Sequence, residues 1–209
     1  MVDAPPLKPL NIPSRLAGTP DGAPKYAVTV KNAAGADVTV ADPDATRAAV
    51  ALMNLHAVTG GAACHWGGPA AFAEIMAASH ALMFGVEGRQ WHEAFNFVND
   101  AGHTENGVYA LRANYGFDGL TYNALRGFRG IDSKLTGHGE SHLNPEGILI
   151  SNGPLGSGLP QAQGLAVGDK LGDAEGDAVG LALGLVDGDA LGEMLGDELG
   201  DVLGDSDGD

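Results

Sequence analysis

The sequence predicts an α/β fold in which helices surround a short parallel sheet. Two apolar runs have the length and composition of buried strands. They lie near residues 95–99, which read Phe-Asn-Phe-Val-Asn, and near residues 147–151, which read Gly-Ile-Leu-Ile-Ser. Segments of helical length flank and separate these runs, at about 44–58, 69–84, 103–115 and 155–170.

Residues 1–41 are predicted to form a proline-rich arm followed by a small hairpin. Six prolines precede Lys25, which excludes a helix and leaves this part extended on the body or disordered. Beyond Lys25, apolar and polar residues alternate on both sides of Ala34-Gly35. This pattern is typical of two strands joined by a tight turn.

Signals for helix ends divide the next part of the chain. Asp42-Pro43 supplies an N-cap and a first-turn proline for the first helix, and Gly60-Gly61 ends it. A glycine-rich loop then carries His65 into the second helix. A further helix is predicted to follow His103, just beyond the first apolar run. A group at the carboxyl end of a strand in an open α/β sheet lies where ligands usually bind.

Composition limits the function classes. The chain has 209 residues, of which 44% are apolar, enough for one domain of ordinary size. From Asp169 onward, ten Asp and three Glu stand against one Lys, so about −12 of the formal charge of −16 lies there. No basic cluster is present to neutralise phosphates, so neither nucleic acid nor a membrane is an expected partner. One cysteine and the lack of a signal segment predict a cytoplasmic protein.

The stretch from residue 137 to 158 carries the clearest signal for a ligand. It reads GHGESHLNPEGILISNGPLGSG and places His138 and His142 beside Glu140 and Glu146. A loop rich in glycine exposes backbone N–H groups close to these imidazoles. Such a loop suits a polar, phosphate-bearing ligand at the N-terminus of the helix that follows.

Three motifs in this order increase the specificity of the signal. The first is His65-Trp66-Gly67-Gly68-Pro69, the second is Val98-Asn99-Asp100-Ala101-Gly102-His103, and the third joins Gly137-His138 to Gly153-Pro154-Leu155-Gly156-Ser157-Gly158. Together they resemble the N-terminal, thiamine diphosphate-binding domain of transketolases. The resemblance covers about residues 45–171, so an incomplete domain is predicted over 42–171.

The resemblance implies transfer of a two-carbon ketol unit between sugar phosphates, with thiamine diphosphate as cofactor. His65 and His138 would line the entrance and serve proton transfers near the reacting carbons. His103 would approach the cofactor diphosphate, so all three histidines are predicted catalytic residues. Neutral imidazoles suit proton transfer near pH 7, whereas the thiazolium of the cofactor carries the carbanion chemistry.

The resemblance also implies a cofactor-binding loop and a partner. Gly153, Pro154 and Leu155 would lie under the aminopyrimidine, with hydrogen bonds from the backbone of Gly153 and Leu155. The family's site lies between two subunits, so a homodimer or a complementary C-terminal chain is implied. An apolar surface around Leu155 to Val167 would then support dimerisation.

The chain departs from the family pattern near the second motif and after Leu171. Glu105 follows His103 closely, and its charge would repel a diphosphate. The family's Gly-Asp-Gly and later Asn, which hold Mg²⁺, have no counterpart, because no asparagine follows Asn152 and glycine recurs at every fourth position from Gly164. The Mg²⁺ ligands are therefore not identifiable, and the chain is expected to be truncated before them.

Residues 172–209 are predicted to be a disordered, acidic Gly-Asp repeat tail. In a helix, glycine at every fourth position costs about 1 kcal/mol each relative to alanine. In a strand, leucines would alternate with acids on the same face, which leaves no apolar side. Neither a helix nor a strand would bury enough apolar surface to offset the conformational entropy lost when the tail becomes ordered.

Three functions stay open from the sequence. The chain is a transketolase-like fragment that is inactive alone or needs a partner, a noncatalytic binding or scaffold protein with a solubilising tail, or a small metal-dependent hydrolase. The hydrolase would use His65, His103 and His138 and hold zinc. Cys64 is not expected to be a nucleophile, because no orienting acid is identifiable. The other histidines expected to be packing or surface residues are His56, His80 and His92.

Overall fold

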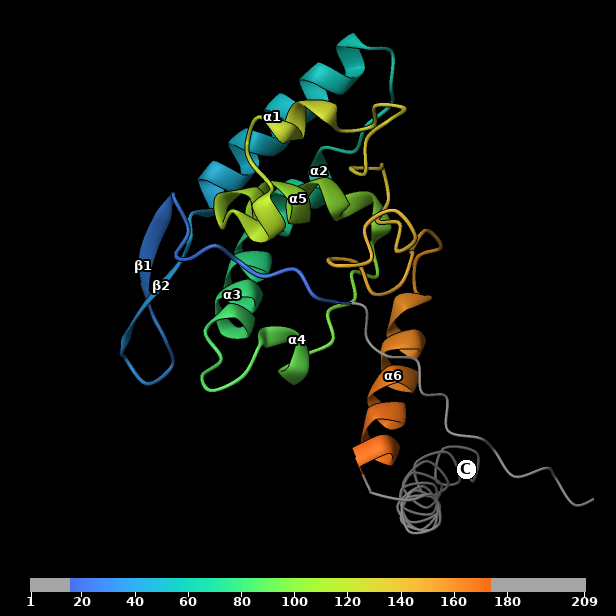
Figure 1. Cartoon of the computed structure of the whole chain (residues 1–209). Coiled ribbons are helices and arrows are strands. Elements are labelled where there is room, and N and C mark those ends of the chain that lie inside the picture. Colours follow the sequence, from blue (N-terminus) through green and yellow to red (C-terminus); the bar gives the residue numbers. More distant parts are fainter. Residues whose placement is uncertain (1–15, 174–209) are drawn as a thin grey trace, which may run out of the picture. The chain divides into compact units, whose positions relative to one another are not determined.

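The computed structural model describes residues 16–173 (Figure 1). The chain divides into two compact units, one formed by Pro13–Ala162 and the other by Met1–Ile12 with Gln163–Asp209. The helix α6 (Gly158–Asp173) crosses the boundary in sequence, and all other described elements belong to the first unit. The predicted arm as far as residue 15 and the predicted tail from residue 174 lie outside the described residues.

A two-stranded antiparallel sheet opens the described part. It pairs β1 (Ala27–Lys31) with β2 (Asp37–Ala41), and Val28 lies opposite Val40. Gly35 adopts the left-handed backbone that the turn requires, with φ of +79°. The hairpin predicted from the alternating pattern is therefore confirmed.

The first helix, α1 (Pro43–Thr59), follows directly. The carboxylate of Asp42 accepts a hydrogen bond from the backbone N–H of Asp44 at 2.9 Å, which satisfies one of the free donors of the first turn. Gly60 ends the helix. The predicted helix over residues 44–58 is thus confirmed to within one residue at each end.

The second predicted helix, over residues 69–84, is divided into two. These are α2 (Gly67–Ala71) and α3 (Ala73–Phe84), which meet at Phe72. Below them in Figure 1 lies the short helix α4 (Trp91–Ala94), whose Trp91 donates through Nε1 to the carbonyl oxygen of Gly18 at 2.7 Å. That bond fixes the N-terminal segment against α4.

The centre of the first unit is α5 (Glu105–Asn114), in which every residue is buried. It follows the 3₁₀ turn η1 (Gly102–Thr104), so the helix predicted over residues 103–115 is confirmed. One side packs on α1 and the other on β2 and α3, which explains why no polar face is present. The residues of α5 in the first contact are Tyr109, Ala110 and Ala113, and those in the second are Val108 and Leu111.

The chain leaves α5 through two short 3₁₀ turns, η2 (Phe117–Gly119) and η3 (Ala124–Gly127). The second of these packs beside α1 in Figure 1. Within residues 16–173, no helix has the length and apolar character needed to cross a bilayer.

The predicted parallel sheet is not formed by the described residues. Neither residues 95–99 nor residues 147–151 form a strand, and the described chain contains the single sheet β1-β2. Phe95 and Phe97 of the first run and Leu149 of the second pack against the same cluster around Trp91. Packing of this kind uses side chains, whereas a sheet requires paired backbone groups. The apolar pattern therefore predicted partial burial of the two runs and was wrong about their backbone pairing.

Candidate functional site

Three histidines from three separate parts of the chain lie together on the first unit. The imidazole of His65 lies 4.7 Å from that of His103 and 6.4 Å from that of His138, measured between ring centroids. His65 is exposed and the other two are partly exposed, so the cluster is open to solvent. The structure brings together the three residues that the sequence predicted as catalytic.

Two buried asparagines fix the backbone of His65. Asn54 of α1 and Asn106 of α5 both donate through Nδ2 to the carbonyl oxygen of His65, at 2.7 and 3.2 Å. Asn106 also donates to Oδ1 of Asn54 at 2.9 Å. Because buried amides require partners, these bonds hold the loop at a defined place on two helices. Sequence reasoning missed both asparagines, since neither belongs to a recognisable motif.

Glycines allow the three loops to approach one another. A Cβ on Gly68 would lie 3.0 Å from Nε2 of His103. A Cβ on Gly102 would lie 2.4 Å from the carbonyl oxygen of Asn152 and 3.4 Å from the Cβ of His138. The backbone contact leaves no room for a side chain at Gly102, whereas a side chain at Gly68 would require Thr104 and His103 to shift.

His138 is held in its neutral form. Partial burial lowers the pKa of its imidazole, and the charges of His65, Arg129 and His103 lower it further, whereas Glu140 raises it. A neutral imidazole can accept a proton near pH 7. This protonation state agrees with the proton-transfer role that the sequence predicted for His138.

Arg129 adds a permanent positive charge beside the cluster. Its guanidinium packs against Gly137, where a Cβ would lie 2.6 Å from Cζ. Its backbone is left-handed, with φ of +62°, and its N–H donates to the carbonyl oxygen of Leu135 at 2.8 Å. No local motif marks Arg129, which the sequence prediction missed. A guanidinium beside a cluster of imidazoles suits an anionic group such as a phosphate.

The loop before α6 is tied to the segment before η1. The carboxylate of Asp100 accepts hydrogen bonds from the backbone N–H groups of Gly156, at 3.1 Å, and Gly158, at 2.5 Å. The side chain of Asn152 donates to the carbonyl oxygen of Asn99 at 2.5 Å. Because these N–H groups already donate hydrogen bonds to Asp100, they do not form the phosphate site that the sequence predicted at this helix N-terminus.

The residues predicted to bind the cofactor lie at the open side of this loop. No atom lies within 4 Å of a Cβ built on Gly153, Pro154 is exposed, and Leu155 is 69% exposed. Within the described residues, no acceptor bonds the backbone N–H of Gly153 or Leu155. Both groups are therefore free to contact a ligand.

Glu105 does not face the cluster as the sequence suggested. It is 4% exposed, and its carboxylate accepts a hydrogen bond from Nδ2 of Asn99 at 2.8 Å. Burial raises the pKa of the carboxyl, while Asn99 and the charge of Arg112 oppose that shift. The carboxylate is enclosed between α5 and Gly139, where a Cβ would lie 2.9 Å from its Cδ. The expected repulsion of a diphosphate on the surface is therefore weakened.

The other candidate residues do not join this cluster. His142 is exposed and lies 3.7 Å from Glu140, and His80 is fully buried, as expected for a packing residue. Burial raises the pKa of the Cys64 thiol, which disfavours the reactive thiolate.

Among residues 16–173, no group of three or more His, Cys, Asp or Glu side chains has the arrangement of a metal site. The described residues thus give no support to a zinc hydrolase.

Comparison with known proteins identifies the family. The family described as transketolase, thiamine diphosphate binding domain, matches residues 44–182, which is more than half of the chain. The chain belongs to the transketolase family. Its thiamine diphosphate-binding domain extends past Leu171, where the motifs alone predicted that the resemblance ends. Residues 174–182 of the matched region lie outside those that the structure describes.

Relatives of this transketolase domain occur in bacteria, a slime mould and plants. This chain is 31% identical to the transketolase of Rhodobacter capsulatus over 125 residues, and 32% identical to that of Dictyostelium discoideum over 121 residues. These matches cover 58% and 57% of this chain and 18% of each relative. The chloroplastic transketolase of Solanum tuberosum is 39% identical over 80 residues, which cover 38% of this chain and 11% of that protein. No solved structure matches the chain.

Proposed function

We propose that this domain forms one part of a transketolase site that binds thiamine diphosphate and transfers a two-carbon ketol unit between sugar phosphates. The chain spans less than a fifth of the length of the first two relatives named above. The family resemblance implies that a second copy of the chain, or a chain that carries the remaining domains, completes the site. The observation that carries this proposal is the convergence of His65, His103 and His138, with Gly102 in contact both with His138 and with Asn152, the residue before Gly153.

The chemistry of these residues fits the cofactor. Arg129 and His103 would contact the diphosphate, because both can donate hydrogen bonds to phosphate oxygens. The free backbone N–H groups of Gly153 and Leu155 would contact the aminopyrimidine. When bound, the cofactor supplies a thiazolium that stabilises the carbanion formed on the ketol unit.

The histidines would handle protons and hydroxyl groups of the sugar. His138 is neutral near pH 7, so its imidazole could take a proton from a substrate hydroxyl. His65 is exposed at the outer side of the cluster and would contact the sugar phosphate first. Asp100 would hold the loop before α6 in place through its two backbone contacts.

The described residues do not fit the metal that the family uses with this cofactor. No acidic or histidine group among residues 16–173 is arranged to hold an ion. We therefore assign no step to Mg²⁺ and expect its ligands to come from outside the described residues.

The exposed side chains of Leu155 and Leu159, at 69% and 65%, offer an apolar surface for a partner subunit.

Calorimetric titration of the full chain with thiamine diphosphate, with and without Mg²⁺, tests the proposal. We expect saturable binding that weakens at least tenfold in His103→Ala, on the order of one hydrogen bond to a charged group. His92→Ala is the matched control, because His92 lies in α4 and outside the cluster. Its affinity should equal that of the unchanged protein.

Two outcomes would count against the proposal. A folded sample that shows no binding at millimolar cofactor would favour the noncatalytic scaffold. Equal losses in His103→Ala and His92→Ala would mean that binding does not involve the cluster.

A further inference from the structure

A cavity lies against α5, at the residues Tyr109 and Arg112. Its volume is about 330 Å³, and its walls come from α5, from the turn η2 and from the segment Ser133–Leu135. Tyr109 and Arg112 of α5 both line it. None of the three histidines of the candidate site lines it, so the cavity is separate from the proposed cofactor site.

Arg112 is a buried cation that forms no direct salt bridge with a described residue, although the charge of buried Glu105 stabilises it. It is 3% exposed, and its Nε and Nη1 donate to two neutral acceptors, Nε2 of His80 at 3.3 Å and the carbonyl oxygen of Gly147 at 2.5 Å. Within the described residues, its Nη2 has no hydrogen-bond partner. Burial lowers the pKa of Arg112 to about 10, so the side chain is still charged at neutral pH. The charge of Glu105 offsets part of the cost of burying the guanidinium, and Nη2 is left as a buried donor for a further acceptor.

Tyr109 supplies a second buried donor in the same wall. It is 1% exposed, and its hydroxyl makes no hydrogen bond to another described residue. Burial raises the pKa of the Tyr109 hydroxyl and the hydrogen-bonding influence of Thr136 lowers it, but Thr136 donates its own proton to the carbonyl oxygen of His138. Two buried donors that line one cavity and both lack acceptors indicate a missing acceptor.

We propose that this cavity binds a small oxyanion, a phosphate or a carboxylate, through Arg112 Nη2 and Tyr109 Oη. One oxyanion group can accept from both donors and neutralise the guanidinium at the same time. The exposed Lys134 adds a second positive charge to the lining. Asp118 is the only carboxylate among the described lining residues, and its exposure to solvent screens its repulsion. The charge of buried Glu105 acts on both Arg112 and Tyr109 and would oppose a second anion.

The test is calorimetric titration of the full chain with inorganic phosphate and, separately, with acetate at constant ionic strength. We expect one of the two anions to bind saturably, with affinity reduced at least about tenfold in Tyr109→Phe. This variant removes only a hydroxyl that lacks a partner, so it should fold as the unchanged protein does. Lys134→Ala should weaken binding severalfold, because it removes an exposed charge. Replacement of Arg112 is avoided, since it would also remove the bonds to His80 and Gly147.

His103→Ala separates this cavity from the cofactor site. Anion binding that persists in His103→Ala and is lost in Tyr109→Phe would support the proposal, whatever the result with thiamine diphosphate. Binding that is lost in His103→Ala and unchanged in Tyr109→Phe would place the anion at the histidine cluster and overturn the proposal. The absence of binding by either anion would also overturn it.

Discussion

The buried pair His80 and Arg112 shows how one residue sets the protonation state of another. Nδ1 of His80 lies 3.0 Å from the carbonyl oxygen of Met76, to which it must donate its proton. Nε2 then carries a lone pair and accepts a hydrogen bond from Nε of Arg112. Burial, and next the charge of Arg112, lower the pKa of His80 from 6.5 to about 3. His80 therefore stays neutral in the folded protein over the usual pH range.

This shift predicts a loss of stability in acid. Because the pKa is lower in the folded state, the contribution of His80 is complete above about pH 6.5 and falls as the pH drops toward 3. Between pH 7 and pH 5 the loss from this residue should reach about 2 kcal/mol. Urea denaturation at the two pH values measures it, and His80→Gln should reduce the difference by about that amount.

The matched control for this measurement is His92→Gln, because His92 is not fully buried. Glu105 has the opposite sign, since its raised pKa costs stability as the pH rises, but it is present in all the proteins compared. A pH dependence that is the same in His80→Gln and in the unchanged protein would contradict the assignment.

At the scale of single elements, the helix α2 must approach η1 closely. A Cβ on Gly68 would lie 2.9 Å from Cγ2 of Thr104 and 3.0 Å from Nε2 of His103, whereas a Cβ on Gly67 would meet nothing within 4 Å. The two glycines are neighbours in the same short helix. They therefore form a matched pair for testing whether the position of His103 matters.

We predict that Gly68→Ala displaces the ring of His103 and lowers the affinity for thiamine diphosphate severalfold. The methyl group should also cost roughly 1–3 kcal/mol of stability if Thr104 cannot move. Gly67→Ala should leave the affinity unchanged and should be neutral or stabilising by up to about 1 kcal/mol. Calorimetry and urea denaturation of both variants decide this, and equal affinities would show that the ring position is unimportant.

Elements with local signals could be predicted from the sequence, and those that depend on distant partners could not. Asp42-Pro43 and Gly60 fix the ends of α1 by themselves, and the hairpin follows from its turn and its alternation. The strands expected near residues 95–99 and 147–151 failed because an apolar run predicts burial and not backbone pairing. Pairing depends on a second segment, which no local pattern specifies.

At the scale of the whole molecule, the order of three motifs predicted which histidines meet. His65, His103 and His138 are up to 73 residues apart in sequence, and only the family resemblance joins them before the fold is known. Arg129 and Asn106 could not be found in this way. Their roles depend on how a loop and a buried helix are placed, and their residue types alone carry no signal.

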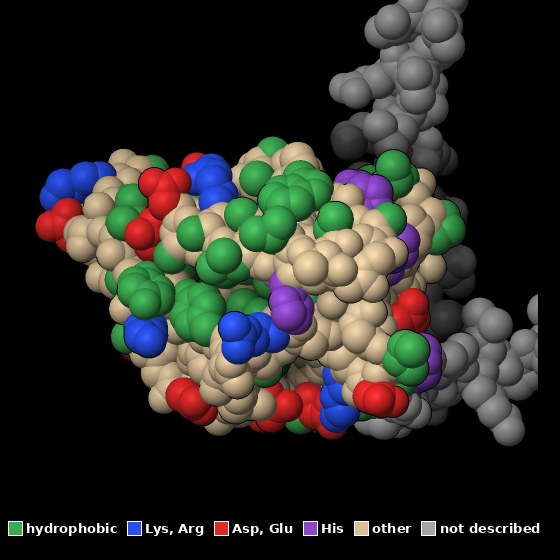
Figure 2. All heavy atoms as spheres, turned by 90° about the horizontal axis from the view of Figure 1, so that it is seen from above, with side chains coloured by type: hydrophobic (Ala, Val, Ile, Leu, Met, Phe, Trp, Pro, Cys, Tyr) green, Lys and Arg blue, Asp and Glu red, His purple; other side chains and the backbone are tan. Residues whose placement is uncertain are grey.

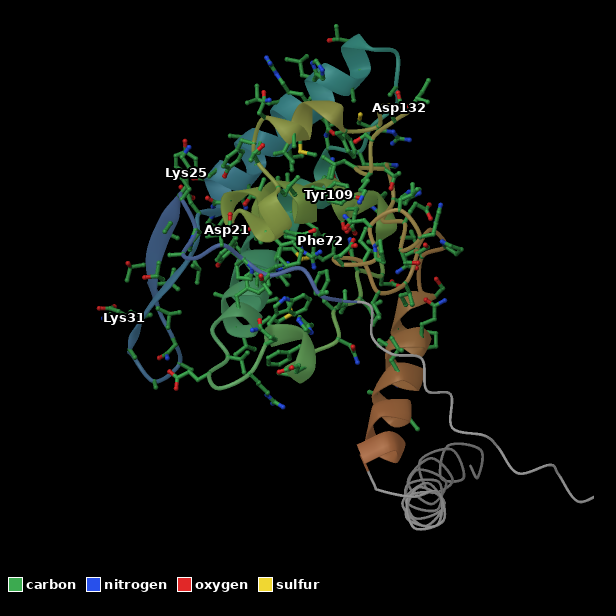
Figure 3. All side chains as sticks on the ribbon, viewed as in Figure 1. Asp21, Lys25, Lys31, Phe72, Tyr109 and Asp132 are labelled. Carbon is green, nitrogen blue, oxygen red and sulfur yellow. The ribbon has the colours of Figure 1, made fainter. Side chains whose placement is uncertain are left out.

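The separation of two anion sites is also a property of the whole molecule. The proposed cofactor site has Arg129 as its cation, and the proposed oxyanion cavity has Arg112. The helix α5 contributes to both, through Asn106, which holds the loop of His65, and through Tyr109, which is labelled on this helix in Figure 3. Figure 2 shows apolar, basic and histidine side chains sharing one face of the molecule. Because none of the three histidines lines the cavity, variants in one site should leave the other unchanged.

The central claim is that His103 and Arg129 recognise the diphosphate of the cofactor. Its most direct test is the ratio of the dissociation constants of thiamine and thiamine diphosphate, measured by calorimetry on the same preparation. We predict that the diphosphate binds at least about tenfold more tightly, and that Arg129→Gln reduces this ratio without changing the affinity for thiamine. Equal affinities for the two compounds, or a ratio that Arg129→Gln leaves unchanged, would contradict the account.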